Sequence, residues 1–389
     1  MEAWLKDKFR GDWQIWFIVI VLSLASTLVV YSSTSALAYK HNLTNEHYLI
    51  SHATLLFAGI FLIWLVHRID YTIYARISNI LIIGTAPLLV ITYFFGTTVG
   101  GASRWISIFG IVSFQTSDLV RIILITHLSA MLARRQNIEY TPKEFYKIIG
   151  WCVGLCGMIA FSNFSTAVIL GVTCLVIMWI GRVPSKYIIY TTLGGTAVLL
   201  LSVIGGVIAK KYNYDIGRGT VVVERVEAFS GLDLDGDNII GNADRDDNFQ
   251  REQALIAVAR GGILGIGPGN SLQRNYLPEA FSDYIYAILV EEYGMLGGIT
   301  TVLLYLWLFY RGLINIRNTD RAFGGLLSVG LIFSIVFQAF IHIMINVGLG
   351  PVTGQTLPLM SKGGTSILFT ALAIGIVLSI TRDKYEQAR

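Results

Sequence analysis

The chain has 389 residues, of which 54% are hydrophobic and 14% charged, with a formal net charge of +4 at pH 7. An ordinary soluble domain is excluded, because such domains carry about 25% charged residues. Long apolar runs separated by short charged stretches are typical of a protein that crosses a membrane several times, with roughly 20 residues in each span. The runs are continuous and do not alternate, which predicts helices and not the strands of a membrane barrel.

Ten apolar runs predict an all-α fold with ten transmembrane helices. In chain order they cover about residues 14–36, 48–66, 77–95, 116–133, 146–164, 166–181, 187–209, 284–309, 323–349 and 364–381. The first run is too long for a cleaved signal peptide, so we expect it to remain as a helix. An even number of spans places both termini on one side of the membrane. Most Lys and Arg residues fall on that side, which is therefore predicted to be cytoplasmic.

The connections between the runs are short except for one, so we expect a single membrane domain over residues 1–389. The exception is about residues 210–283, a large extracytoplasmic loop. Within it, residues 220–229 have the pattern of an amphipathic helix, which could lie at the membrane interface or pack on the spans. A second, smaller external loop covers about residues 96–115 and contains Arg104.

An acidic stretch in the large loop nearly fits the spacing of a calcium-binding loop. Its acids fall at positions 1, 3, 5 and 12 of the pattern and are Asp233, Asp235, Asp237 and Asp244. Asn238 stands where the turn glycine is expected, and no flanking pair of helices is evident. Two interpretations stay open, a cation site and a solvated acidic turn.

A glycine-rich stretch at residues 259–271 contains Arg260, ends in Asn270 and Ser271, and is followed by Arg274. Closely spaced glycines let a ligand approach the backbone, whose amides can then face an anion. Glycines equally let a re-entrant segment pack tightly among helices. The spacing does not decide between anion binding and packing.

Asp283 begins an apolar span, where an ionisable side chain is costly unless it faces a wet cavity or a partner. Glu279 lies four residues earlier, so a helix that began before Asp283 would project both carboxylates from one face. Paired acids suit general base catalysis. Asp283 could equally stabilise the helix N-terminus, with Ser282 as the N-cap.

The last two apolar runs are separated by a broken segment rich in glycine and proline, residues 346–366. Non-helical backbone at membrane depth is tolerated where it lines a cavity, and Ser361 and Lys362 would give that cavity a polar, cationic wall. In the fourth run, Asp118 and Arg121 are spaced to form an ion pair, which we expect to be structural.

These segments together resemble the SEDS family (shape, elongation, division and sporulation) of bacterial membrane proteins, from about residue 14 to 381. The resemblance rests on residues 101–105 (GASRW), 115–121 (QTSDLVR), 261–271 (GGILGIGPGNS), 277–283 (LPEAFSD), 291–297 and 351–366, where Val-Thr-Gly is followed by Leu-Pro-Leu and Ser-Lys-Gly-Gly-Thr-Ser. Two departures are Arg274 in place of a lysine and Lys362 in place of a tyrosine.

The resemblance implies peptidoglycan glycosyl transfer, in which lipid II is polymerised with inversion on the outer face of the bacterial cytoplasmic membrane. It implies that Asp283 is the catalytic residue. We expect substrate contacts from Arg104, Arg274, Glu279, Lys362, Ser361, Asn270 and Ser271. A divalent cation (Mg or Mn) is a possible cofactor, and no organic cofactor is expected.

The expected partners are lipid II, a class B penicillin-binding protein transpeptidase and other division proteins, and no nucleic acid. Residues 356–359 (TLPL) resemble the cell-division branch of the family, FtsW, more than the elongation branch, RodA, whereas residues 352–354 lean the other way. Two other functions stay open, a lipid II flippase and a scaffold for a division complex.

Overall fold

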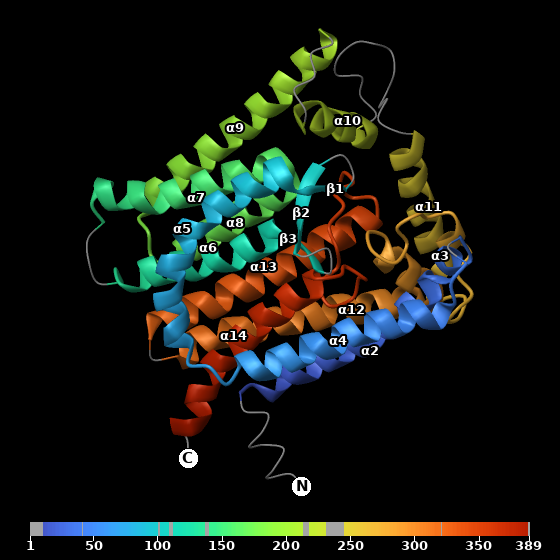
Figure 1. The fold of residues 1–389 in the computed structure, drawn as a ribbon, viewed down its shortest axis with the longest axis horizontal. Helices are drawn as coiled ribbons and strands as arrows, with labels where there is room; N and C mark the ends of the chain where they lie inside the picture. Colours follow the sequence, from blue (N-terminus) through green and yellow to red (C-terminus); the bar gives the residue numbers. More distant parts are fainter. Residues whose placement is uncertain are drawn as a thin grey trace.

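The structure is a computed structural model that describes residues 11–40, 42–99, 102–108, 112–136, 140–212, 218–230, 245–319 and 321–387. Ten long helices make up most of this part of the chain (Figure 1). They are α2 (Trp13–Ser33), α4 (Asn45–Val66), α5 (Tyr71–Phe95), α6 (Thr116–Ala133), α7 (Pro142–Ser162), α8 (Phe164–Ile180), α9 (Ser185–Lys211), α12 (Ile285–Asn318), α13 (Ala322–Asn346) and α14 (Ser366–Gln387). Each coincides with one of the ten predicted runs, which confirms a helical membrane protein.

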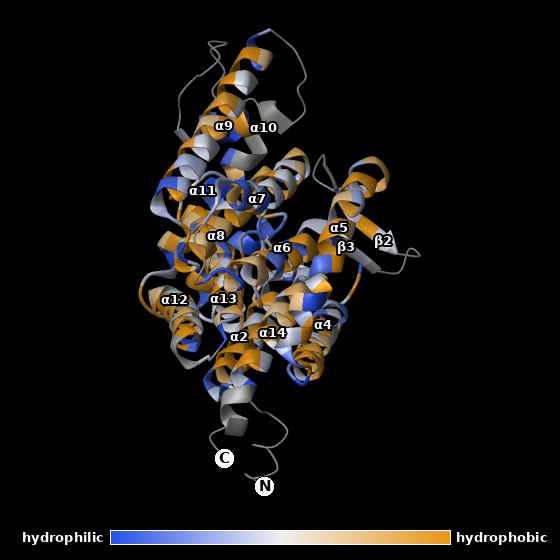
Figure 2. Cartoon of the chain, turned by 90° about the vertical axis from the view of Figure 1, so that its left-hand side faces the viewer, coloured by the Kyte–Doolittle hydropathy of each residue, from blue (hydrophilic) through white to orange (hydrophobic). Residues whose placement is uncertain are grey.

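Eight of these helices are long and apolar enough to cross a membrane. The other two, α8 and residues 366–382 of α14, are apolar but shorter. The number of ten spans therefore stays a prediction. The central helices are α6 and α13, whose apolar windows are 83% and 78% buried, whereas that of α9 is 11% buried. Figure 2 shows hydrophobic residues along the outer helices as well, as expected where lipid is the solvent.

The remaining elements are short and belong to the connections: α3 (Ser35–Lys40), α10 (Arg218–Ser230), α11 (Arg245–Gly261), the 3-10 helix η1 (Gln273–Asn275), and the strands β1 (Thr97–Val99), β2 (Ala102–Ile108) and β3 (Val112–Gln115). The strands form an antiparallel sheet in the order β1-β2-β3, in which Trp105 pairs with both Thr97 and Gln115. The all-α prediction missed this sheet, because strands of 3 to 7 residues carry no signal in a search for long apolar runs.

The helix predicted at residues 220–229 is confirmed as α10, and it packs on α9. Lys210 Nζ lies 2.7 Å from Glu227 Oε2, and the side chains of Glu227 and Val223 are buried. The structure thus favours the second interpretation of this segment, a loop helix that packs on a span.

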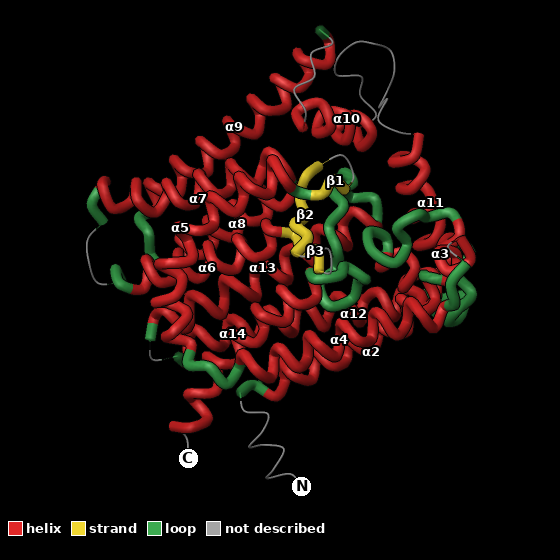
Figure 3. Tube along the Cα trace, viewed as in Figure 1, coloured by secondary structure: helices red, strands yellow, loops and turns green. Residues whose placement is uncertain are grey.

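The connections gather at two ends of the helix bundle (Figure 3). At one end the beginning of α2 meets the end of α14, because the Asp12 amide donates to Thr381 Oγ1 at 3.0 Å. The end of α12 joins them through Arg311, whose Nε donates to Asp12 Oδ2 at 2.6 Å. The opposite end carries the sheet and two irregular segments, residues 262–284 and 347–365, which lie side by side (Figure 1).

The glycine-rich stretch packs backbone to backbone against α12. The amide of Ile266 donates to Glu291 O at 3.0 Å, and the Met295 amide donates to Gly262 O at 2.9 Å. Helix α12 is interrupted at this contact by Gly294, whose φ is 68°. A Cβ on Gly265 would lie 2.2 Å from Glu292 O. Here the glycines serve close packing, and the Ile266 amide is engaged by the protein itself.

This contact predicts that Gly265→Ala is much more destabilising than Gly262→Ala. Both glycines have positive φ, +82° and +52°, so each alanine costs about 1–2 kcal/mol of backbone strain. A Cβ on Gly265 would also force the backbone at Glu292 to move, whereas nothing lies within 4 Å of a Cβ on Gly262. Thermal unfolding in detergent should show a loss of at least about 3 kcal/mol for Gly265→Ala. Equal losses for the two variants would contradict the packing interpretation.

Candidate active site

Asp283 lies in the last turn before α12, at the end of the bundle opposite the Asp12–Thr381 contact. Its amide donates to Glu279 O at 3.0 Å, and its carboxylate accepts from Ser282 Oγ at 3.0 Å. Helix α12 begins at Ile285, so the helix does not start before Asp283. The N-cap position is Tyr284, which forms no capping hydrogen bond through its side chain. The expectation that Ser282 caps this helix was wrong, because its hydroxyl binds the neighbouring carboxylate.

Asn346, in the last turn of α13, does the capping instead. Its side chain is buried, and its Oδ1 accepts from the Ala287 amide at 3.0 Å in the first turn of α12. Its Nδ2 donates to the Asp283 carbonyl at 3.0 Å. One amide side chain therefore fixes both the helix start and the backbone of Asp283. This role was not predicted from the sequence, although an Asn at the end of an apolar run is a residue type suited to capping a helix.

The broken segment after α13 holds the Asp283 turn from a second direction. Ser361 Oγ donates to Ser282 O at 2.6 Å, and the Lys362 amide donates to Phe281 O at 2.9 Å. Gly354 has a φ of +61°, and a Cβ at this position would lie 3.4 Å from Asp283 Oδ2. The structure thus brings Ser361 and Lys362 to the turn of Asp283, with which the resemblance grouped them, and the backbone at Gly354 passes directly beside the carboxylate.

The Lys362 ammonium group lies 4.0 Å from the centre of the Tyr48 ring, on α4. It forms no ion pair with a carboxylate in the described part of the chain. Burial lowers the pKa of Lys362 to about 8. A cation that has lost part of its hydration and has no carboxylate partner is well suited to bind an anionic group of a ligand.

Glu279 lies near enough to Asp283 for the two charges to interact, although its side chain is exposed. The protein surrounding its carboxylate raises the pKa of Glu279, and the negative charge of Asp283 raises it further. A nearby cation, either a side chain of the protein or a bound ion, would reduce the repulsion between these two negative charges.

Ser271 and Arg274 bind two buried carboxylates on α12, Glu291 and Glu292. Glu291 accepts from the Ser271 hydroxyl and, at 3.3 and 3.4 Å, from the amides of Leu272 and Gln273. Glu292 accepts from the Ser32 hydroxyl and lies 3.9 Å from Arg274 Nη1, which also donates to Ser32 Oγ at 2.7 Å. The amides here do face an anion, as one interpretation predicted, but the anion is the protein's own carboxylate.

The other predicted site residues lie apart from this network. Asn270 is exposed, and its Nδ2 donates to Ile266 O at 3.0 Å within the same turn. Arg104 lies on β2, and this sheet reaches the broken segment through Thr365 Oγ1, which donates to Ser113 O at 3.1 Å. The substrate-binding roles of Asn270, Ser271 and Arg274 stay predictions, since their contacts described above are all within the chain.

The four predicted metal ligands Asp233, Asp235, Asp237 and Asp244 lie outside the described residues. Among the residues that the structure does describe, no three His, Cys, Asp or Glu side chains are close enough together to hold a metal ion. Two carboxylates suffice for Mg²⁺ when phosphate groups supply further ligands, so the absence of a three-residue cluster among these residues does not decide the question of a metal ion.

Asp118 and Arg121 form the predicted ion pair, with Nη2 and Oδ1 3.9 Å apart, and both side chains are buried. Arg121 also donates to Gln338 on α13, which in turn donates to Thr356 O at 2.9 Å. The ion pair is thus connected through Gln338 to the backbone of the broken segment, which confirms a structural role.

Comparison with known proteins agrees with this architecture. The chain is 30% identical over 391 residues to the probable peptidoglycan glycosyltransferase FtsW of Coxiella burnetii, covering 97% of this chain and 98% of the relative. Its fold matches a chain of a solved peptidoglycan synthase complex, with a TM-score of 0.75, 19% identity and coverage of 97% and 99%. It also matches the crystal structure of the rod shape determining protein RodA of Thermus thermophilus, with a TM-score of 0.68, 19% identity and coverage of 96% and 98%.

The model of one protein family, described as cell cycle protein, matches residues 12–386. This match includes every long helix and both irregular segments around Asp283. The chain therefore belongs to the FtsW/RodA/SpoVE family of cell cycle proteins.

Proposed function

We propose that this protein is a peptidoglycan glycosyltransferase that polymerises lipid II into β-1,4 glycan strands. Family membership supports the reaction, and the relative named a probable peptidoglycan glycosyltransferase is matched over nearly its whole length. The observation that carries the proposal is the double fixation of the Asp283 turn, by Asn346 on one side and by Ser361 and Lys362 on the other. Such preorganisation suits a carboxylate that must meet a reacting group in one geometry.

In the proposed reaction the 4-hydroxyl of the acceptor GlcNAc attacks the anomeric carbon of the donor MurNAc. A new C–O bond forms, and the bond to undecaprenyl diphosphate breaks on the opposite face, which inverts the anomeric centre. Asp283 accepts the hydroxyl proton as general base. Diphosphate is a good leaving group, so it needs positive charge and not an acid. Lys362 and Arg104 supply that charge.

A divalent cation, Mg²⁺ or Mn²⁺, is part of the proposal. Glu279 would hold it together with the diphosphate, which leaves Asp283 to act as the base, and its charge would offset the repulsion between the two carboxylates. The role proposed for Arg274, Ser271 and Asn270 is to hold residues 270–274 in the conformation that the substrate meets. Ser271 and Arg274 do so by binding the buried acids of α12.

We further propose ten spans with both termini in the cytoplasm and the Asp283 end on the outer face of the inner membrane. The joined ends of α2 and α14 support a common side for the termini. The domain would be single, and the partner would be a class B penicillin-binding protein, since the matched fold comes from a synthase complex. The match to a relative named FtsW favours action in cell division, with other division proteins, over elongation.

The first prediction from this proposal is that Asp283→Asn lowers lipid II polymerisation by about 10²- to 10⁴-fold, because a positioned general base is lost. The measurement is glycan length on gels from labelled lipid II, with the transpeptidase partner present and with or without chelator. Glu279→Gln keeps Asp283 and should lose less.

A wild-type rate for Asp283→Asn would reject the catalytic assignment. If Asp283→Asn moved lipid II across vesicles normally and wild-type protein made no polymer, the protein would be a flippase. A scaffold is indicated if neither activity is found in the wild type.

The second prediction concerns pH. Lys362 loses its proton as the pH rises past about 8, so its contribution to diphosphate binding should vanish between about pH 7 and 9. The polymerisation rate should fall over this range in the wild type, whereas Lys362→Arg, which stays charged, should not show this step. Lys362→Gln should be slow at every pH. A fall that persists unchanged in Lys362→Arg would assign the titration to another group.

The third prediction separates positioning from stability. Asn346→Leu removes the hydrogen bonds to Asp283 and Ala287, and it should lower kcat by tenfold or more with little change in KM. The matched control is Asn315→Leu at the other end of α12, which removes a buried hydrogen bond to Ser328 Oγ. Each variant should lose about 1–3 kcal/mol of stability. If both lost kcat equally, Asn346 would have no specific role at the site.

A further inference from the structure

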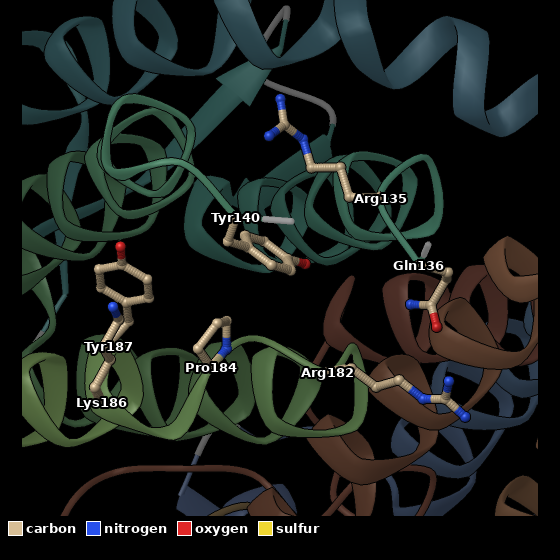
Figure 4. Close-up of a pocket in the computed structure, with 7 residues that line it drawn as sticks. All are labelled: Arg135, Gln136, Tyr140, Arg182, Pro184, Lys186 and Tyr187. Carbon is tan, nitrogen blue, oxygen red and sulfur yellow. The ribbon is translucent and has the colours of Figure 1, made fainter. Parts of the chain in front are cut away.

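A cavity of about 310 Å³ lies at the end of the bundle opposite Asp283. Its lining residues come from two connections. Arg135, Gln136 and Tyr140 lie between α6 and α7, and Arg182 and Pro184 lie between α8 and α9, with Lys186 and Tyr187 in the first turn of α9. Figure 4 shows Tyr140 facing Pro184 and Tyr187 across this space. Gln136 Nε2 donates to Gly181 O at 3.3 Å, which ties the two connections together. The cavity thus has a defined wall on each side.

The lining of this cavity is strongly basic. Its described residues include Arg135, Arg182 and Lys186, and none of them is a carboxylate. Arg135 Nη1 pairs with Glu144 at 2.6 Å, a residue outside the lining. Neither Arg182 nor Lys186 forms an ion pair with a carboxylate in the described part of the chain. At least two positive charges therefore face the cavity with no carboxylate partner among the residues that the structure describes.

The surroundings place this cavity at the level of a membrane surface. Three large aromatic side chains near the same helix ends are exposed, Tyr146 (69%), Trp179 (70%) and Tyr190 (67%). Tyr and Trp are enriched where the lipid headgroups begin. Basic pockets between helix ends at this level are suited to anionic lipid headgroups. Cations that only orient the protein in the membrane would not need to line a cavity.

We propose that this cavity binds the phosphate group of an anionic phospholipid headgroup, such as that of phosphatidylglycerol. Arg182 and Lys186 supply the charge, and the Tyr140 and Tyr187 rings form its walls. This site is separate from the catalytic proposal, because it lies at the other end of the helices and involves none of the residues around Asp283.

The test uses the full-length wild type and the double variant Arg182→Gln/Lys186→Gln. The control is Arg76→Gln/Arg321→Gln, which removes two exposed cations outside the cavity lining. Each protein is titrated in neutral detergent with short-chain phosphatidylglycerol or phosphatidylcholine, and bound lipid is counted by native mass spectrometry. A separate arm uses inorganic phosphate with phosphatidylcholine present.

We expect the wild type and the control to bind one phosphatidylglycerol in preference to phosphatidylcholine. The double variant should bind phosphatidylglycerol about 30-fold more weakly, from two lost charges near the surface. The proposal is overturned if the two lipids bind the wild type equally, or if the control loses as much affinity as the double variant. It is also overturned if inorganic phosphate displaces the lipid at millimolar concentration, since the ligand would then be a soluble anion.

Discussion

Backbone groups that leave helical geometry at the end of a membrane protein must find partners inside the protein, and this constraint shapes the whole candidate site. Residues 262–284 and 347–365 are both irregular, and each provides partners for the other. The Lys362 amide binds Phe281 O, and the hydroxyl of Ser361 binds Ser282 O. The hydrogen bonds that satisfy the non-helical backbone thus also position Asp283, so the site and the fold depend on one set of interactions.

The buried acids Glu291 and Glu292 extend this principle into the bundle. A buried carboxylate is costly unless several donors reach it, and here hydroxyls, amides and arginines do so. Apart from the Ser32 hydroxyl on α2, these donors come from residues 271–274 at the end of the glycine-rich stretch, which are thereby attached to α12. Because Asp283 follows this segment directly and precedes α12, its position depends on that attachment. Arg274 therefore contributes to the site through Glu292 and Ser32, whatever it contacts in a substrate.

The sequence predicted the long helices well, because an apolar run of about 20 residues has few alternatives in a membrane. It also predicted that residues 361–362 belong to a broken segment with a polar, cationic wall, and only the resemblance grouped them with Asp283 in one substrate site. It could not identify the cap of α12, because Ser282 and Asn346 are equally suitable residue types and only tertiary packing selects between them. The small sheet was missed for a related reason, since its strands are defined by pairing and not by hydropathy.

The cations of this chain differ in function according to their partners, which composition cannot show. Arg121 and Arg274 each lie beside a buried carboxylate, so their charges are compensated within the protein and support its architecture. Lys362 at one end, and Arg182 and Lys186 at the other, have no such partner among the described residues. Positive charge without a counter-charge from the protein lowers the cost of binding an anion. Both ends of the bundle thus carry cations suited to a phosphate group, which in the proposals above belongs to a leaving group at the Asp283 end and to an intact lipid at the other.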